Sequence, residues 1–112
     1  MRIDKWAVTA QEALQAAIGV ATDANASQVE PIHLLKALLG SGERNLSAIV
    51  ERVGADPHTI EAEVDRAIAA APKVTGGNAE LGASRDLVRV GDAAERLASK
   101  MQDSYVTSEH LL

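Results

Sequence analysis

Part of this sequence occurs twice, at a constant separation of 77 residues. The segment VEPIHLL at 29–35 returns as VTSEHLL at 106–112, and the same offset extends toward the N-terminus without a gap. The extension adds identities at Ala16 and Ala93, Ala17 and Ala94, Ala21 and Ala98, and Ser27 and Ser104. A long internal repeat of this kind indicates a fold that is built twice from one supersecondary unit.

The apolar positions of both copies recur every three or four residues, which places them on one face of a helix. This apolar face consists of Ala10, Ala13, Ala17, Val20, Ala21 and Ala24 in the first copy, and of Leu87, Val90, Ala94, Leu97, Ala98 and Met101 in the second. One position breaks the correspondence, because Leu14 is matched by Gly91, and glycine inside a helix costs roughly 1 kcal/mol. The pattern predicts an all-α fold of two related helical repeats.

Proline and capping residues mark where the helices begin. Pro31 suits the first position of a helix, Asp56 and Ser84 suit N-caps, and Thr107 suits the cap of a last turn that starts at Ser108. The expected helices are 8–24, 31–39, 46–53, 57–71 and 85–101. We predict one domain at 1–112, with a first repeat at about 1–72, a loop at about 73–83 and a second repeat at about 84–112 that is truncated one turn after its cap.

Charge and composition exclude several classes of protein. The net charge is −5, and Lys and Arg are scattered singly, so no basic stripe is available to neutralise phosphates. The chain has no cysteine for a disulfide framework, and it has no apolar run near the roughly 18 residues that span a bilayer. We therefore expect no nucleic-acid partner, no membrane partner and a cytoplasmic location.

No motif for covalent catalysis or cofactor binding is present in the sequence. No glycine-rich segment is followed by Lys-Ser or Lys-Thr, as a phosphate loop requires, and no serine lies in a Gly-x-Ser-x-Gly turn. Asp103 and Glu109 could act as paired carboxylates, but a solvated turn and a first-turn acid favoured by the helix dipole also explain them. We expect no enzyme activity, no catalytic residues and no cofactor in this chain.

Two histidines, His33 and His110, occupy equivalent positions in the two copies, and each lies close in sequence to a carboxylate, Glu30 or Glu109. One interpretation is a zinc site; the other is that each imidazole caps or packs against the start of its own helix. The sequence lacks the arrangement of two histidines one helical turn apart that places both ligands on one face, and no cysteine assists. We favour the capping interpretation and expect no metal.

The repeated motifs resemble those of the Clp N-terminal domain family. The similarity rests on EPIHLLKALL at 30–39, SEHLL at 108–112 and AQEAL at 10–14. It implies two four-helix repeats related by a pseudo-twofold axis, placed at the front of ring-forming Hsp100 ATPases as a mobile docking module for substrates or adaptors. Within the family, PKVTGG at 72–77 looks most like the ClpB branch of protein disaggregases.

The resemblance also implies a function and partners. The domain would bind exposed hydrophobic or unfolded segments of aggregated polypeptides and pass them to the pore of a homohexameric ring, within a chaperone that refolds proteins in the stress response. ATP would bind in the ATPase modules of the full-length protein and not in this chain. The alternative is the adaptor-binding domain of a ClpC- or ClpA-type unfoldase that serves a protease.

Positions that the family uses to handle substrates can be carried onto this chain residue by residue. Asp103 and Glu109 match the acids of the family, whereas Ala7 stands where Thr is common, so that a helix cap is lost. We add Trp6 and Leu111 as candidates for contacts with a substrate or partner. These five residues are the site that the sequence and the resemblance predict.

The second copy ends early compared with the family, in which further helices follow. A helix of one turn is not stable alone. We therefore expect apolar surface around Leu87, Val90 and Leu111 to be exposed, or to be shared with a second chain in a dimer of the fragment.

Overall fold

The computed structural model describes residues 4, 6–41, 44–71, 82–101, 103 and 105–112. These residues contain six helices, whose bounds are close to those that the sequence predicts. They are α1 (Val8–Asp23), α2 (Pro31–Leu39), α3 (Arg44–Arg52), α4 (Pro57–Ala70), α5 (Arg85–Lys100) and α6 (Ser108–Leu111). These residues contain no strand, so the all-α class is confirmed. The predicted loop at 73–83 lies, except for its last two residues, outside the described part.

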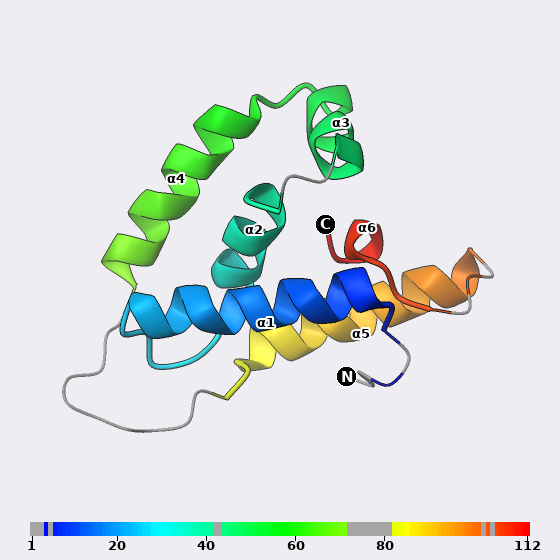
Figure 1. The fold of residues 1–112 in the computed structure, drawn as a ribbon, viewed down its shortest axis with the longest axis horizontal. Coiled ribbons are helices and arrows are strands. Elements are labelled where there is room, and N and C mark those ends of the chain that lie inside the picture. Colours follow the sequence, from blue (N-terminus) through cyan, green and yellow to red (C-terminus); the bar gives the residue numbers. More distant parts are fainter. Residues whose placement is uncertain (1–3, 5, 42–43, 72–81, 102, 104) are drawn as a thin grey trace.

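The helices are arranged around α2, which packs on both α1 and α4. In Figure 1, α4 lies on the far side of α2 from α6, and α6 lies between α3 and the C-terminal end of α5. The short helix α6 contacts α1, α3 and α5, so it joins elements that are distant in sequence. No helix of the described residues is both long and apolar enough to cross a bilayer.

Two short parallel backbone bridges connect the first copy of the repeat to the second. One bridge joins Trp6 to Val106, and the other joins Val29 to Ala83. The offset of 77 residues relates Trp6 to Ala83 and Val29 to Val106. Each copy therefore contributes the same two positions, and the bridges exchange them, as a pseudo-twofold axis between the copies requires.

The hydrogen bonds at these bridges follow the same exchange. The Ala7 N–H donates to the Val106 carbonyl at 2.7 Å, and the Ser84 N–H donates to the Val29 carbonyl at 2.9 Å. Ala7 and Ser84 are themselves related by the offset. The repeat in the sequence is thus a repeat in backbone pairing.

Small side chains dominate the buried face of α1. Ala10, Ala17 and Ala21 are fully buried, and Ala13 is nearly so. Alanine loses no side-chain entropy in a helix and lets a neighbouring helix approach closely. The larger apolar side chains that fill the core come mainly from outside α1, and the largest fully buried ones are those of Trp6, Leu34, Leu46 and Leu87.

The expectation that Leu87 and Leu111 are exposed is wrong. Leu87 and Leu111 are buried, with exposed fractions of 1% and 6%, because α6 packs against α1 and α5. Conversely, the apolar face assigned to α5 does not stay buried at its C-terminal end, where Leu97 and Met101 are 42% and 58% exposed. Much of the apolar surface that was expected to form a dimer is therefore buried within one chain.

The start of α2 is closed by the side chain of His33, as the capping interpretation predicts. The Glu30 N–H donates to His33 Nδ1 at 2.8 Å, and the same contact occurs at α6, where the Thr107 N–H donates to His110 Nδ1 at 2.9 Å. A histidine at the third helical position thus satisfies a backbone donor that the helix would leave unpaired. Among the described residues, no three His, Cys, Asp or Glu side chains gather to hold a metal.

The ring of His33 is held in its neutral form. Its Nδ1 accepts a hydrogen bond and so carries no proton, which places the proton on Nε2. That Nε2 is buried and has no hydrogen-bond partner among the described residues. Burial lowers the pKa of His33 below its ordinary value, and the nearby charge of Glu30 opposes this shift only in part.

We expect acidification to destabilise the wild-type protein more than a His33→Gln variant, which keeps an acceptor at the third position of α2. Because the folded state lowers the pKa of His33, the unfolded chain takes up the proton first. Stability contributed by neutral His33 is complete above the ordinary pKa of 6.5 and is lost as the pH falls below it. Urea unfolding of the wild type and of His33→Gln, at about pH 7.5 and about pH 5, measures how much stability each protein loses on acidification.

The exposed His58 offers a matched control for this measurement. A His58→Gln variant should lose as much stability on acidification as the wild type does. An equal loss in wild type and His33→Gln would contradict the assigned role of His33.

Candidate functional site

Three of the five predicted site residues meet at one groove. Ala7 reaches it from the start of α1, Asp103 from the segment after α5, and Glu109 from α6. The groove, called the α5–α6 groove below, has a volume of about 580 Å³. It is lined by Ala7, Ile49, Leu97, Met101, Asp103, Tyr105, Thr107, Glu109 and His110.

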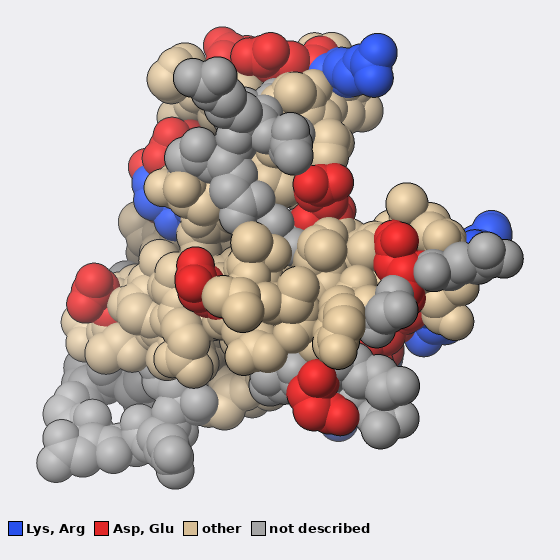
Figure 2. Space-filling view, turned by 45° about the vertical axis from the view of Figure 1, so that its right-hand side comes forward, with Lys and Arg blue, Asp and Glu red and all other residues tan. Residues whose placement is uncertain are grey.

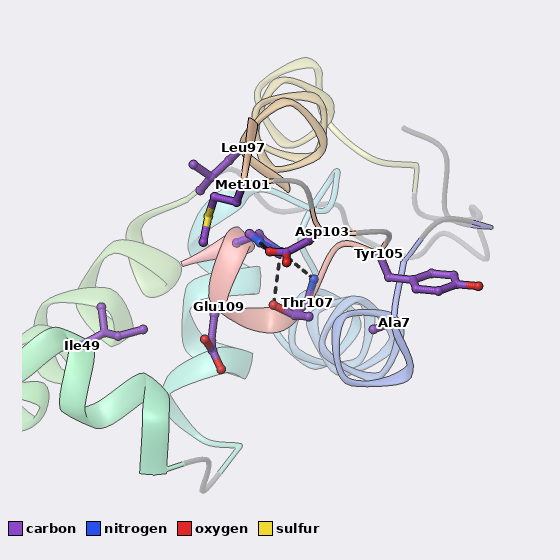
Figure 3. A pocket seen from close by; sticks show the side chains of 9 residues that line it. Ala7, Ile49, Leu97, Met101, Asp103, Tyr105, Thr107 and Glu109 are labelled. Atoms are coloured by element: carbon purple, nitrogen blue, oxygen red, sulfur yellow. Dashed lines mark hydrogen bonds and ion pairs between the residues drawn. The ribbon is translucent and has the colours of Figure 1, made fainter. Parts of the chain in front are cut away.

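Four large apolar or aromatic side chains make up much of this lining. Ile49 comes from α3, Leu97 from α5, and Met101 and Tyr105 from the segment that follows α5; their exposed fractions range from 38% for Ile49 to 58% for Met101 and Tyr105. In Figure 3, Ile49 and Met101 face each other across an open space beside α6, whereas the ring of Tyr105 points away from them. Exposed apolar side chains gathered on one concave surface indicate a binding surface.

A hydrogen-bonded pair, Asp103 and His110, forms the polar part of the groove. His110 Nε2 lies 2.9 Å from Asp103 Oδ2, and both this contact and the contact of Thr107 with the His110 ring appear as dashed lines in Figure 3. Because His110 Nδ1 accepts from the Thr107 N–H, the ring proton is on Nε2, which donates to the carboxylate. The ring is therefore neutral, and the pair keeps the negative charge of Asp103.

The charged residues that line the α5–α6 groove are acidic. Asp103 and Glu109 carry carboxylates, and none of the lining residues described is Lys or Arg. Figure 2 shows acidic atoms bordering the notch between the α3 end of the molecule and the end of α5. The groove thus combines an apolar surface with a negative edge.

Trp6 and Leu111, the other two predicted site residues, do not line this groove. Trp6 is 2% exposed, belongs to the core and donates from Nε1 to Glu95 Oε1 at 3.3 Å. Leu111 is also buried and borders a separate apolar hollow of about 240 Å³ that it shares with residues of α2. Contact of either side chain with a ligand stays a prediction.

The sequence interpretation missed most of the apolar lining, although a comparison of the two copies contains the signal. Ala26 and Asp103 are structurally equivalent, since the Ala26 N–H donates to the Ala21 carbonyl and the Asp103 N–H to the Ala98 carbonyl, at 2.9 and 2.8 Å. The second copy has Leu97, Met101, Asp103 and Tyr105 where the first has Val20, Ala24, Ala26 and Gln28. Where the second copy has larger or charged residues at positions that are smaller in the first copy, the difference indicates a site that belongs to the second copy.

The whole of this architecture has a counterpart among known proteins. The sequence pattern of the Clp repeat (R) N-terminal domain matches residues 5–112. The chain belongs to the Clp N-terminal domain family. This Clp N-terminal domain is 39% identical over 112 residues to the chaperone protein ClpB of Agrobacterium fabrum, a match that covers the full chain and 13% of ClpB. The resemblance to Clp N-terminal domains is thereby confirmed.

Solved structures support the same fold. The Hsp104 N-terminal domain from Candida albicans superposes with a TM-score of 0.85 at 23% identity, covering 96% of this chain and 70% of the other. A ClpV N-domain in complex with a VipB peptide superposes with a TM-score of 0.76 at 20% identity, covering 97% of this chain and 66% of the other. The chain spans about an eighth of the length of the ClpB relative, so it corresponds to the N-terminal domain of a longer chaperone there.

We expect an Ala7→Ser variant of this Clp N-terminal domain to be more stable by about 1 kcal/mol. Ala7 makes no side-chain cap at α1, whereas Ser84, its counterpart at α5, accepts a hydrogen bond from the Leu87 N–H at 3.1 Å. The backbone angles of the two caps agree closely, with φ and ψ of −63° and 161° at Ala7 and −68° and 163° at Ser84. Urea unfolding measures the difference.

Substitution of Ala16, an exposed residue in the middle of α1, by Ser supplies the control. It introduces the same hydroxyl where no free backbone donor is available, so it should bring no gain in stability. A gain that is equal in both variants, or absent in Ala7→Ser, would contradict the capping argument.

Proposed function

We propose that this Clp N-terminal domain docks exposed apolar segments of unfolded or aggregated polypeptides in the α5–α6 groove, as part of a ClpB-type disaggregase. The observation that carries the proposal is the exposure of Ile49, Leu97 and Met101 on one concave surface with a polar edge. Unfolded chains differ from folded surfaces by showing apolar side chains, so a groove of this kind distinguishes the two states. No bond is made or broken in this function.

The size and openness of the groove suit a weak and broad selection of segments. A volume of about 580 Å³ accommodates a few side chains of an extended or helical segment and not a whole folded domain. Met101 contributes a flexible, polarisable side chain that adapts to ligands of different shape. Modest affinity at each groove is sufficient if several copies act together.

Similarity to known proteins supports docking of polypeptides as well. The ClpV N-domain was solved with a bound VipB peptide, and it shares this fold. The ClpB relatives are chaperone proteins. We propose that the present domain belongs to a chaperone of this kind and that the chaperone is cytoplasmic. A homohexameric ring with ATP in its other modules would present several grooves and raise affinity through effective concentration.

Substitution of Leu97 and Met101 by Ser should weaken binding of an unfolded model protein by about tenfold, since each half-exposed side chain has part of its burial energy left to gain. A suitable ligand is lysozyme with reduced and carbamidomethylated cysteines, measured by calorimetric titration. Native lysozyme, which has the same sequence, should not bind. Equal affinity for both forms would overturn the proposal.

Val53 offers a matched control for this loss. It is 77% exposed and lies outside the lining of the α5–α6 groove, so Val53→Ser removes exposed apolar surface elsewhere and should leave affinity within about twofold.

If the domain instead does not bind unfolded lysozyme and captures one discrete folded partner, the adaptor-binding function of a ClpC- or ClpA-type unfoldase replaces the present proposal.

A further inference from the structure

We infer that α4 opens away from α2 while the rest of the domain stays folded, and that the ion pairs of Lys36 with Glu61 and Asp65 determine how often it does so. Figure 1 shows α4 at the edge of the molecule, on the opposite side of α2 from α6. The inference is independent of the docking function proposed above, because it concerns a different part of the domain. In folded proteins, the elements with few buried apolar contacts open most readily.

The helix α4 buries little of its surface. The structure describes all 14 of its residues, and Val64 is the only one of them that is buried. Val64 also lies outside the main cluster of buried residues that forms the core. By comparison, α2 buries four of its nine residues: His33, Leu34, Ala37 and Leu38. Burial of apolar surface therefore contributes much less to the position of α4 than to that of α2.

Ion pairs supply a second connection between α2 and α4. Lys36 Nζ, on α2, lies 2.9 Å from Glu61 Oε1 and 2.9 Å from Asp65 Oδ1, both on α4. Glu61 and Asp65 are four residues apart, so they are neighbours on one face of the helix, where one ammonium group contacts both. The hydrogen bonds to Asp65 and Glu61 raise the pKa of Lys36 above its ordinary value of 10.5, so the group is charged at neutral pH.

The partial burial of Lys36 makes these ion pairs stronger than pairs on an open surface. Its side chain is 28% exposed, and those of Glu61 and Asp65 are 37% and 55% exposed. Fully exposed pairs contribute little because water and salt screen them, whereas a partly covered cation shared by two carboxylates is screened less. Because α4 has a single buried side chain, the ion pairs form a substantial part of its attachment to α2.

Opening of α4 would have two structural consequences. Helices of fewer than about 12 to 15 residues are marginal in water, so a detached α4, with 14 residues, would lose much of its helical structure. Opening would also widen an apolar hollow of about 290 Å³ that Ile60 of α4 lines together with Leu35 and Leu39 of α2. Both leucines are half-buried while α4 is in place. The ion pairs of Lys36 thus control access to apolar surface of α2.

The reactivity of single introduced cysteines tests the inference, because the chain has no cysteine of its own. Val64→Cys places a thiol at the buried position of α4, and Val29→Cys places one in the core directly before α2. A thiol reagent modifies a buried cysteine only when the structure around it opens. We expect the thiol of Val64→Cys to react at least about tenfold faster than that of Val29→Cys, since α4 opens without the core.

Substitutions of the ion pairs assign the control to Lys36. Lys36→Met removes the charge and keeps an unbranched apolar side chain, so it should accelerate the reaction of Val64→Cys by about three- to tenfold, the range for two partly exposed ion pairs. Lys36→Arg keeps the charge and should retain most of the protection. The double variant Glu61→Gln/Asp65→Asn should match Lys36→Met, and adding Lys36→Met to it should bring no further acceleration.

Two control substitutions separate opening of α4 from unfolding of the whole domain. Arg89→Met removes an exposed ion pair with Asp86 within α5, so it should change the reactivity of Val64→Cys by less than about twofold. Ser84→Ala removes the N-cap of α5, which should accelerate the reaction of Val29→Cys by about fivefold. It should leave Val64→Cys unaffected, because opening of α4 alone does not disturb α5.

Each possible outcome supports or overturns the inference. Equal reactivity of Val64→Cys and Val29→Cys, or equal acceleration of both by Ser84→Ala, would show that α4 opens only with the whole domain. Unchanged reactivity of Val64→Cys in Lys36→Met would overturn the role of the ion pairs. Amide hydrogen exchange of α4 and α1, in the chain without introduced cysteines, makes the same comparison if either valine substitution disturbs folding.

Discussion

The reciprocal backbone pairing between the two copies is the constraint on which the rest of the structure depends. One bridge lies directly before α1 and α6, and the other lies directly before α2 and α5, so the starts of these four helices are fixed in two pairs. The α5–α6 groove is a consequence, because Ala7 and Thr107, which follow the paired residues, are also part of its lining.

Helix boundaries could be predicted from the sequence because they are set by local chemistry. Pro31 and Ser84 act within one turn of their own position, and the histidine cap of α2 closes within three residues. Exposure is decided differently, by elements distant in the chain. Periodicity placed Leu97 and Met101 on an apolar face but carries no information about what covers that face, and in the structure they remain partly exposed.

The sequence predicted part of the candidate site and missed the rest. The resemblance to the family predicted Asp103, Glu109 and Ala7 as site residues, and the structure brings these three to one groove. Ile49 could not be assigned, because α3 reaches the groove only through the packing of α6 against it. Trp6 and Leu111 have the size and polarity expected of contact residues, yet such side chains also stabilise cores, and here they are buried.

The short length of α6 has a consequence for how binding and folding are connected. With four residues, this helix cannot hold itself together and is maintained by the burial of Leu111, by the histidine cap and by contacts with α1, α3 and α5. Glu109 and His110, which it carries, belong to the groove. A segment that binds in the groove makes contacts with α6 only when this helix is folded. Occupancy of the groove and order in this helix are therefore thermodynamically linked.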